Sequence, residues 1–247
     1  MEHHEILGGS SSSKGSISIK SRTYFSIQHL QSAALFARNA YNIEAHYSGG
    51  PSDESFSQHR AYVTGSILSS VFFLEAAINE LFADTVDANS EIVKKLNPSV
   101  TKLMATLWKL EVPRTANFKI LQKFQIALAL AQKEIFDVKA PPYQDVNLLV
   151  KLRNDLVHYE PEWVKLPSSA DFESDDIHRY EKKLRGKFKV NPLTGQGNPF
   201  YPDKCLGHGC AAWAVNSCIK FTDAFFTRIG LPPSYDHIRD RLTEQWR

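Results

Sequence analysis

Apolar residues recur at intervals of three and four along most of the chain, which is the spacing that places them on one face of an α-helix. The first such segment, 25–47, ends at the breaker cluster Gly49-Gly50-Pro51. The next segment, about 56–84, is apolar around most of its circumference, a pattern typical of a central helix in a bundle. Further helices are predicted over residues 90–96, 99–110, 118–136, 144–159, 174–185 and 208–228, with a short polar helix at the end.

The order of these segments predicts an all-α fold. Convincing strand alternation and internal repeats are both absent, and residues 186–204, with repeated Gly, Pro and Asn, are expected to form a loop. Residues 1–22 are rich in Ser and Gly and are expected to be a flexible leader, because they cannot bury enough surface to become ordered. We therefore predict one helical-bundle domain over residues 23–247.

Composition narrows the functional classes. The 247 residues are 43% apolar and 23% charged with a net charge of +2, so a nucleic-acid ligand would have to meet a local basic patch. No run approaches the roughly 18 apolar residues of a membrane span, and the N-terminus lacks the apolar core of a secretory signal. Three cysteines do not make a disulfide framework. A cytoplasmic protein without a membrane partner is expected.

The hexapeptide RNDLVH, from Arg153 to His158, is the strongest candidate for chemistry. Arginine holds phosphate as a planar, permanently charged fork, and histidine is suited to moving protons near neutral pH. Together they would handle a phosphodiester without a metal or other cofactor. Arg153 falls near the middle of the apolar arc of its helix, whereas Lys151 and Asp155 are expected to project toward solvent.

This hexapeptide resembles the signature of the HEPN superfamily, small α-helical domains that include endoribonucleases, toxins of toxin–antitoxin pairs and silent binding modules. The matching positions are Arg153, Asn154 and His158, and the fold expected from the resemblance is a HEPN-like bundle with additional helices. Arg153 and His158 are about 140° apart around one helix. Two copies of the helix crossing at a two-fold axis would complete a composite site, which is the homodimer that the resemblance implies.

The polar residues around the hexapeptide are expected to support it. Asn147 shares one edge of the helix with Asn154 and His158, and Glu75 lies toward the apolar side of the segment 56–84. A glutamate so placed is rarely left unpaired. We predict that Glu75 pairs with Arg153 or hydrogen-bonds to Asn154 or His158, and that Asn79 completes the cluster. A pair that only fixes helix register is the alternative.

One dense basic cluster is a candidate RNA-binding surface. Basic side chains beside aromatic ones suit a phosphate backbone with unstacked bases. The alternative is a solvated helix face paired with nearby carboxylates. The proposed RNA-binding residues are Arg179, Lys182, Lys183, Arg185 and Lys187, and the carboxylates of the alternative are Asp171, Glu173, Asp175 and Asp176.

A zinc site is not expected, although Cys205, His208 and Cys210 lie close together in sequence. Their spacing lacks a second Cys/His pair, and Cys210 fits the apolar face of the last long helix together with Cys218. Gly-rich phosphate loops, paired catalytic carboxylates and serine-nucleophile motifs are also absent. The sequence thus favours a metal-independent endoribonuclease, a toxin or defence effector with a possible antitoxin partner. The alternative is a non-catalytic module that binds RNA, a nucleotide or a protein, or a motif that is purely structural.

Overall fold

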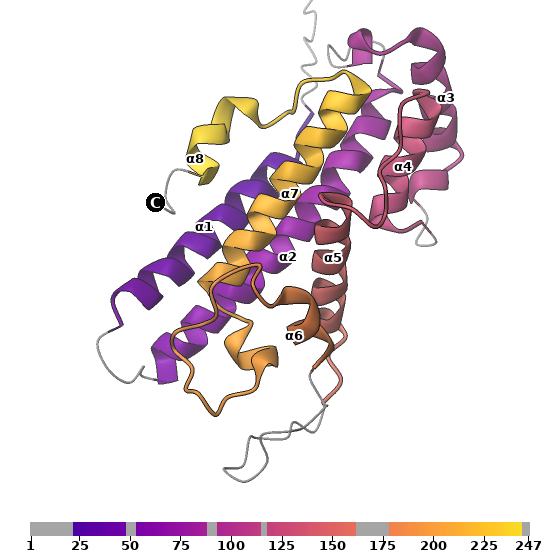
Figure 1. The fold of residues 1–247 in the computed structure, drawn as a ribbon. Coiled ribbons are helices and arrows are strands. Elements are labelled where there is room, and N and C mark those ends of the chain that lie inside the picture. Colours follow the sequence, from indigo (N-terminus) through magenta and orange to yellow (C-terminus); the bar gives the residue numbers. More distant parts are fainter. Residues whose placement is uncertain (1–21, 48–52, 88–92, 115–117, 162–177, 244–247) are drawn as a thin grey trace, which may run out of the picture.

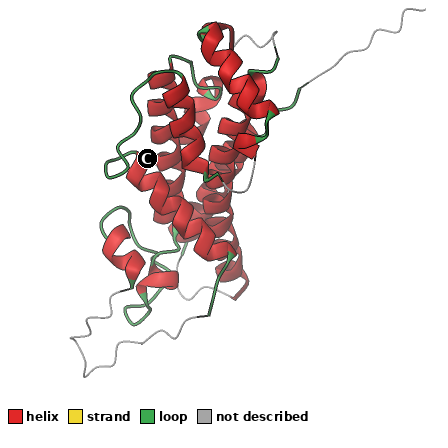
Figure 2. Cartoon of the chain, turned by 90° about the vertical axis from the view of Figure 1, so that its right-hand side faces the viewer, coloured by secondary structure: helices red, strands yellow, loops and turns green. Residues whose placement is uncertain are grey.

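A computed structural model describes residues 22–47, 53–87, 93–114, 118–161 and 178–243. Within these ranges the chain is helical and contains no strand, as Figure 2 shows, so the predicted all-α fold is confirmed. The expected leader, residues 1–22, lies outside the described residues except for its last position.

Three long helices form the body of the bundle. They are α1 (Ser26–Ala45), α2 (Asp53–Asp84) and α7 (His208–Ile229), and they lie side by side in Figure 1. The start of α1 contacts the end of α2, because Glu80 accepts hydrogen bonds from the backbone of Phe25 at 2.7 Å and Ser26 at 2.9 Å. The two helices are therefore antiparallel and form a hairpin.

The remaining helices are shorter and cover the sides and ends of this body (Figure 1). They are η1 (Val93–Lys95), α3 (Pro98–Lys109), η2 (Val112–Arg114), α4 (Ile120–Leu130), α5 (Tyr143–Val157), α6 (Arg179–Leu184), η3 (Phe200–Lys204), η4 (Asp236–Ile238) and α8 (Arg239–Thr243). α5 packs against both α2 and α7, and α4 packs against the same two helices.

The helix α2 is central, as its pattern predicted. Ile67, Phe73, Leu74 and Ile78 are completely buried within the core. By length and composition the stretch 54–84 could also cross a membrane, and a buried core helix meets the same criterion. Among the described residues it is the single helix that meets this criterion. The sequence-based expectation that no segment is apolar enough to span a membrane overlooked this stretch, and its apolar character fits a buried core position equally well.

The helix α4 ends at Leu130, although apolar residues predicted that it would continue to 136. Gln132 adopts a left-handed backbone conformation with φ of 54°, which ends the helix. Downstream, the side chain of Gln125 accepts the Phe136 N–H at 2.8 Å and donates to the Phe136 carbonyl oxygen at 2.9 Å. Phe136 packs against Phe221 at 4.8 Å between ring centroids. Phe136 thus docks the loop after Leu130 onto α7.

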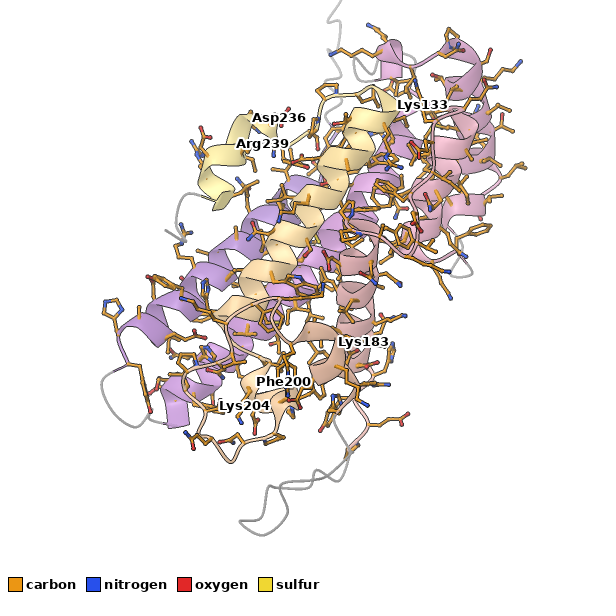
Figure 3. All side chains as sticks on the ribbon, in the orientation of Figure 1. Lys133, Lys183, Phe200, Lys204, Asp236 and Arg239 are labelled. Carbon is orange, nitrogen blue, oxygen red and sulfur yellow. The ribbon has the colours of Figure 1, made fainter. Side chains whose placement is uncertain are left out.

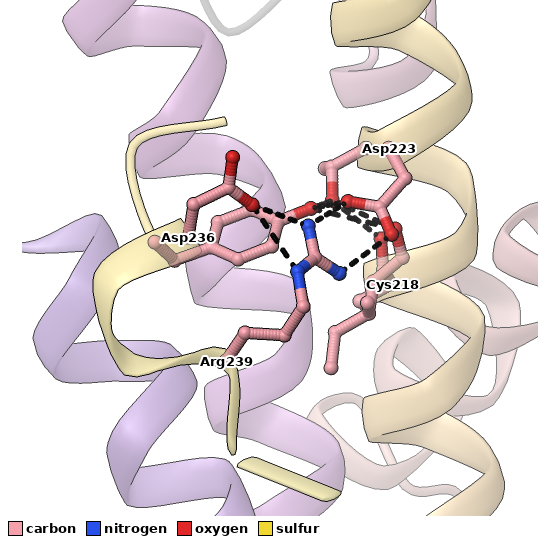
Figure 4. Close-up of polar contacts among 7 residues, drawn as sticks. Cys218, Asp223, Asp236 and Arg239 are labelled. Carbon is pink, nitrogen blue, oxygen red and sulfur yellow. Dashed lines mark hydrogen bonds and ion pairs between the residues drawn. The ribbon is translucent and has the colours of Figure 1, made fainter. Parts of the chain in front are cut away.

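A polar network fixes the C-terminal segment to α7, as Figure 4 shows. Arg239 donates two hydrogen bonds to Asp223, at 2.8 and 2.9 Å, and two more to Asp236, at 2.6 and 3.1 Å. The fully buried Tyr235 donates its hydroxyl proton to Asp223 at 2.6 Å and lies 2.6 Å from the Thr222 hydroxyl. Each polar side chain of this network therefore has at least one hydrogen-bond partner.

Candidate functional site

The helix α5 carries the predicted motif, and its apolar face sets its orientation. Val146, Leu149 and Leu152 are completely buried against the bundle. The helix starts directly after Pro142, whose ring is suited to the first turn, and it gives way at His158. The predicted range 144–159 is therefore confirmed to within two residues at each end.

Arg153 lies half-buried on α5 and has an incomplete set of partners. Its Nε–H is buried and donates no hydrogen bond, and no ion pair joins Arg153 to any carboxylate among the described residues. Burial lowers the pKa of the guanidinium, and the negative charge of Glu75 opposes that shift. An anion in direct contact would stabilise a cation in this position further, and the described part of the chain supplies none.

Glu75 has a different partner from the one predicted. The ammonium group of Lys123, on α4, forms an ion pair with the Glu75 carboxylate and donates to the Asn79 side-chain oxygen at 3.1 Å. Asn79 in turn donates to Glu75 at 3.4 Å. The predicted pairing of Glu75 with Arg153, or its hydrogen bond to Asn154 or His158, is therefore wrong, because Lys123 binds the carboxylate instead. Asn79 does contact Glu75, but the cluster that they form contains Lys123 rather than a residue of the hexapeptide.

Lys123 is the residue that sequence reasoning missed. Its side chain is only 3% exposed, whereas that of Glu75 is 37% exposed. Lys123 lies in the strongly apolar run ILQKFQIALAL, between the buried residues Leu121 and Phe124. A charged residue within such a run is a signal of a buried ion pair, and this signal would have identified Lys123 as a partner for Glu75.

Asn154 and His158 are exposed at the C-terminal end of α5, and Asn147, one of the predicted supporting residues, is half-buried. His158 is the residue that caps the helix, and its backbone N–H donates to the Asn154 carbonyl oxygen at 2.8 Å. Within the described ranges, no hydrogen bond orients the imidazole ring of His158 or links it to Arg153. The structure thus places the three motif residues on one helix end without bringing their side chains together.

The predicted RNA-binding cluster packs against α5. Arg179 pairs with Asp155, and the hydroxyl of Tyr180 donates to the same carboxylate at 2.6 Å. Lys187 pairs with Asp145 at 2.7 Å. The expectation that Asp155 projects into solvent is therefore wrong, because α6 covers that side of α5.

Three of the five basic residues are thus neutralised locally, since Arg185 also pairs with Glu181 one helical turn away. Lys182 and Lys183 remain exposed, and Figure 3 labels Lys183 on α6 beside α5. The carboxylates proposed as alternative partners, at positions 171, 173, 175 and 176, lie outside the described residues. The cluster is therefore in part a docking surface for α5.

The cysteine and histidine residues near the start of α7 have structural partners. Glu44 accepts the backbone N–H of His208 at 2.6 Å and contacts the ring of the buried His59 at 2.7 Å. Burial lowers the pKa of His208, whose Nδ1 lies 3.0 Å from the Ala37 carbonyl oxygen. Cys205 and Cys210 are buried. Among the described residues no group of three potential ligands is placed to hold a metal ion.

Comparison with known proteins finds no family model, no curated protein and no solved structure that matches this chain. The resemblance to HEPN domains therefore rests on the residues of the hexapeptide. Independently of that resemblance, the geometry supports anion binding. Arg153 and Lys123 are two cations near one carboxylate, Glu75, so the cluster retains a positive charge.

Proposed function

We propose that this chain is a metal-independent endoribonuclease of the HEPN type, a cytoplasmic toxin or defence effector that acts as a homodimer. The observation that carries the proposal is the buried, unpartnered Nε of Arg153. A phosphate oxygen is a suitable acceptor for it, because arginine presents several donors in a fixed planar arrangement. Arg153 would hold the scissile phosphate and stabilise the charge that builds on its oxygens.

His158 would supply the proton transfer. An imidazole exchanges protons efficiently near neutral pH, and the exposed position of His158 leaves it accessible to a 2′-hydroxyl or a leaving oxygen. Asn154 would orient the phosphate or the histidine. Because Arg153 and His158 diverge by about 140° around α5, the histidine of one protomer would act with the arginine of the other. Lys182 and Lys183, which are exposed and pair with no carboxylate among the described residues, would steer RNA toward this site.

The test is cleavage of single-stranded RNA in the presence of EDTA by wild type and His158→Ala. Loss of general acid–base catalysis should slow cleavage by about 10²–10⁴-fold, while binding of uncut RNA stays nearly unchanged. DNA of the same sequence should remain intact, since it lacks the 2′-hydroxyl nucleophile. Cleavage of DNA with RNA untouched would contradict the mechanism.

His46 provides a matched control. It caps α1 as His158 caps α5, it is exposed, and its backbone N–H likewise donates to an asparagine four residues earlier, Asn42. The residue directly before that asparagine is Tyr41, whereas Arg153 directly precedes Asn154. His46→Ala should therefore leave cleavage unchanged, and equal losses in both variants would assign the effect to helix capping rather than to catalysis.

A second function, a non-catalytic module that binds RNA, a nucleotide or a protein partner such as an antitoxin, is favoured by one observation. Within the described part of the chain, no neighbouring group orients the His158 ring. In such a module Arg153→Ala should weaken ligand binding and His158→Ala should change little. RNA that stays intact with the wild-type dimer but binds through Arg153 would support this function over the ribonuclease.

A further inference from the structure

Glu75, on α2, interacts with cations from two helices that pack against α2: it forms an ion pair with Lys123 of α4, and its charge acts on Arg153 of α5 without an ion pair. Lys123, from α4, forms the ion pair. Arg153, from α5, experiences the charge of Glu75 without forming an ion pair with it, and its Nε has no acceptor. The same carboxylate is therefore a potential partner for both cations.

We infer that Lys123, by occupying Glu75, keeps Arg153 free for a phosphate group, so that Glu75 is an internal competitor of the ligand. The inference rests on the proposed function, in which Arg153 is the phosphate-binding side chain. Lys123 is accordingly a positioning residue, which acts on the ligand through Glu75 and Arg153.

The different burial of Lys123 and Arg153 distinguishes their roles. Lys123 is 3% exposed and is held by both Glu75 and Asn79, so it cannot reach a ligand in solvent without leaving these partners. Arg153 is half-buried, which makes its unpaired charge costly and accessible at the same time. A phosphodiester at Arg153 would neutralise the one positive charge that Glu75 leaves uncompensated.

This arrangement predicts effects of opposite sign for two substitutions in the same ion pair. Lys123→Met removes the cation that holds Glu75 and leaves a side chain of similar length in the apolar surroundings. The released carboxylate then pairs with Arg153 and competes with the ligand. Glu75→Gln removes the competing charge, so Arg153 binds phosphate more tightly. The double variant should behave like Glu75→Gln, because Lys123 acts only through the carboxylate.

The experiment measures the Kd of full-length protein for a fluorescent single-stranded 2′-O-methyl oligonucleotide, which cannot be cleaved through its 2′ position. We expect Lys123→Met to weaken binding about tenfold and Glu75→Gln to tighten it by about threefold to tenfold, changes of the size that one charge near a phosphate produces. Lys102→Met is the matched control, because it removes the same charge from an exposed position on α3. It should change Kd by much less than Lys123→Met.

Arg153→Met separates the failure of this inference from the failure of the proposed function. If Arg153→Met leaves the Kd unchanged, the phosphate site itself is wrong. If Arg153→Met abolishes binding while Lys123→Met and Glu75→Gln weaken it alike, the site stands and the inferred competition is overturned. The inferred competition is also overturned if Lys123→Met changes the Kd no more than Lys102→Met does.

A measurement without ligand tests the same competition. In wild type, the shifts of the urea midpoint caused by Glu75→Gln and Arg153→Met should be nearly additive, since the two residues form no ion pair and interact only weakly through their charges. In the Lys123→Met background the two shifts should become non-additive, because Glu75 and Arg153 then form a pair. Additive shifts in both backgrounds would overturn the inference even where the oligonucleotide does not bind.

Discussion

Arg239 and Arg153, two of the arginines that lie near carboxylates, have opposite surroundings. Arg239 donates hydrogen bonds to both Asp223 and Asp236, and its hydrogen bonds to Asp223 are the main cause of its raised pKa. Arg153 has a buried Nε without a partner, and burial lowers its pKa. The guanidinium of Arg239 makes four hydrogen bonds within the protein, whereas that of Arg153 has a buried donor, Nε, without an acceptor.

The comparison teaches that the position of an arginine beside acidic residues does not by itself make it structural. At the C-terminus the acidic side chains outnumber the cation, and Tyr235 and Thr222 complete the network. Around Glu75 the cations outnumber the carboxylate, because both Lys123 and Arg153 interact with its charge. The first arrangement favours stability of the fold, and the second favours binding of an external anion.

The largest effect on stability should come from Asp223→Ala. This substitution removes the acceptor of both the buried Tyr235 hydroxyl and the Arg239 guanidinium. We expect a loss of about 2–3 kcal/mol in the free energy of unfolding, measured by urea denaturation. Asp240→Ala, at an exposed position on α8, is the matched control and should change it by less than about 0.5 kcal/mol. Equal losses would mean that the network does not anchor the segment.

A smaller loss is expected from Tyr235→Phe. The ring keeps its edge contact with Phe73, at 5.5 Å between centroids, and Asp223 keeps Arg239 as a partner. Only the hydroxyl hydrogen bonds disappear, so the free energy of unfolding should fall by about 1 kcal/mol. A fall as large as that of Asp223→Ala would place the stabilising effect in the hydroxyl rather than in the arginine.

The advantage of Tyr235 over phenylalanine should depend on alkaline pH. Burial, with the hydrogen bond to Asp223, raises the pKa of Tyr235, so the folded state holds the phenolic proton more tightly than the unfolded state does. The resulting stabilisation is complete below the usual pKa of about 10 and is lost as pH rises above it. The difference in urea midpoint between wild type and Tyr235→Phe should therefore shrink above about pH 10. A difference that grows with pH would contradict this linkage.

The smallest effect on stability is expected at the other arginine. Arg153→Met removes a half-buried cation that has no ion pair among the described residues, and it retains the aliphatic stem. The free energy of unfolding should change by less than about 0.5 kcal/mol or rise, while oligonucleotide binding is lost. A destabilisation of several kcal/mol would instead make Arg153 structural and would remove the contrast with Arg239.

The sequence predicted the helices well, because their patterns are local. The central role of α2 followed from its apolar circumference, and the boundaries of α5 followed from the prolines and polar residues around the hexapeptide. Two predictions differ from the structure: the short helix η3 lies in the predicted loop 186–204, and the predicted end of α4 was six residues too late. The second difference concerns α4. Its apolar continuation packs as a loop on Phe221, and only the tertiary structure distinguishes that use from a helix.

The sequence predicted which residues belong to the candidate site better than it predicted the contacts between them. Glu75 and Asn79 do belong to one polar cluster, as the position of Glu75 on an apolar face indicated. Its cation comes from α4, 48 residues further along the chain, and nothing in the hexapeptide points to that helix. Asp155 shows the same limit, since the arrival of α6 turns an expected solvent-facing carboxylate into a partner of Arg179.

The order of the helices along the chain has a consequence for folding during synthesis. α1 and α2 are neighbours in sequence and can form their hairpin as soon as both have left the ribosome. The helix α7, which covers the other side of α2, begins about 120 residues after α2 ends. At about 5–20 residues per second, the apolar surface of α2 waits for its partner for roughly 6–25 seconds. During that interval the part of α2 that α7 later covers stays accessible to chaperones.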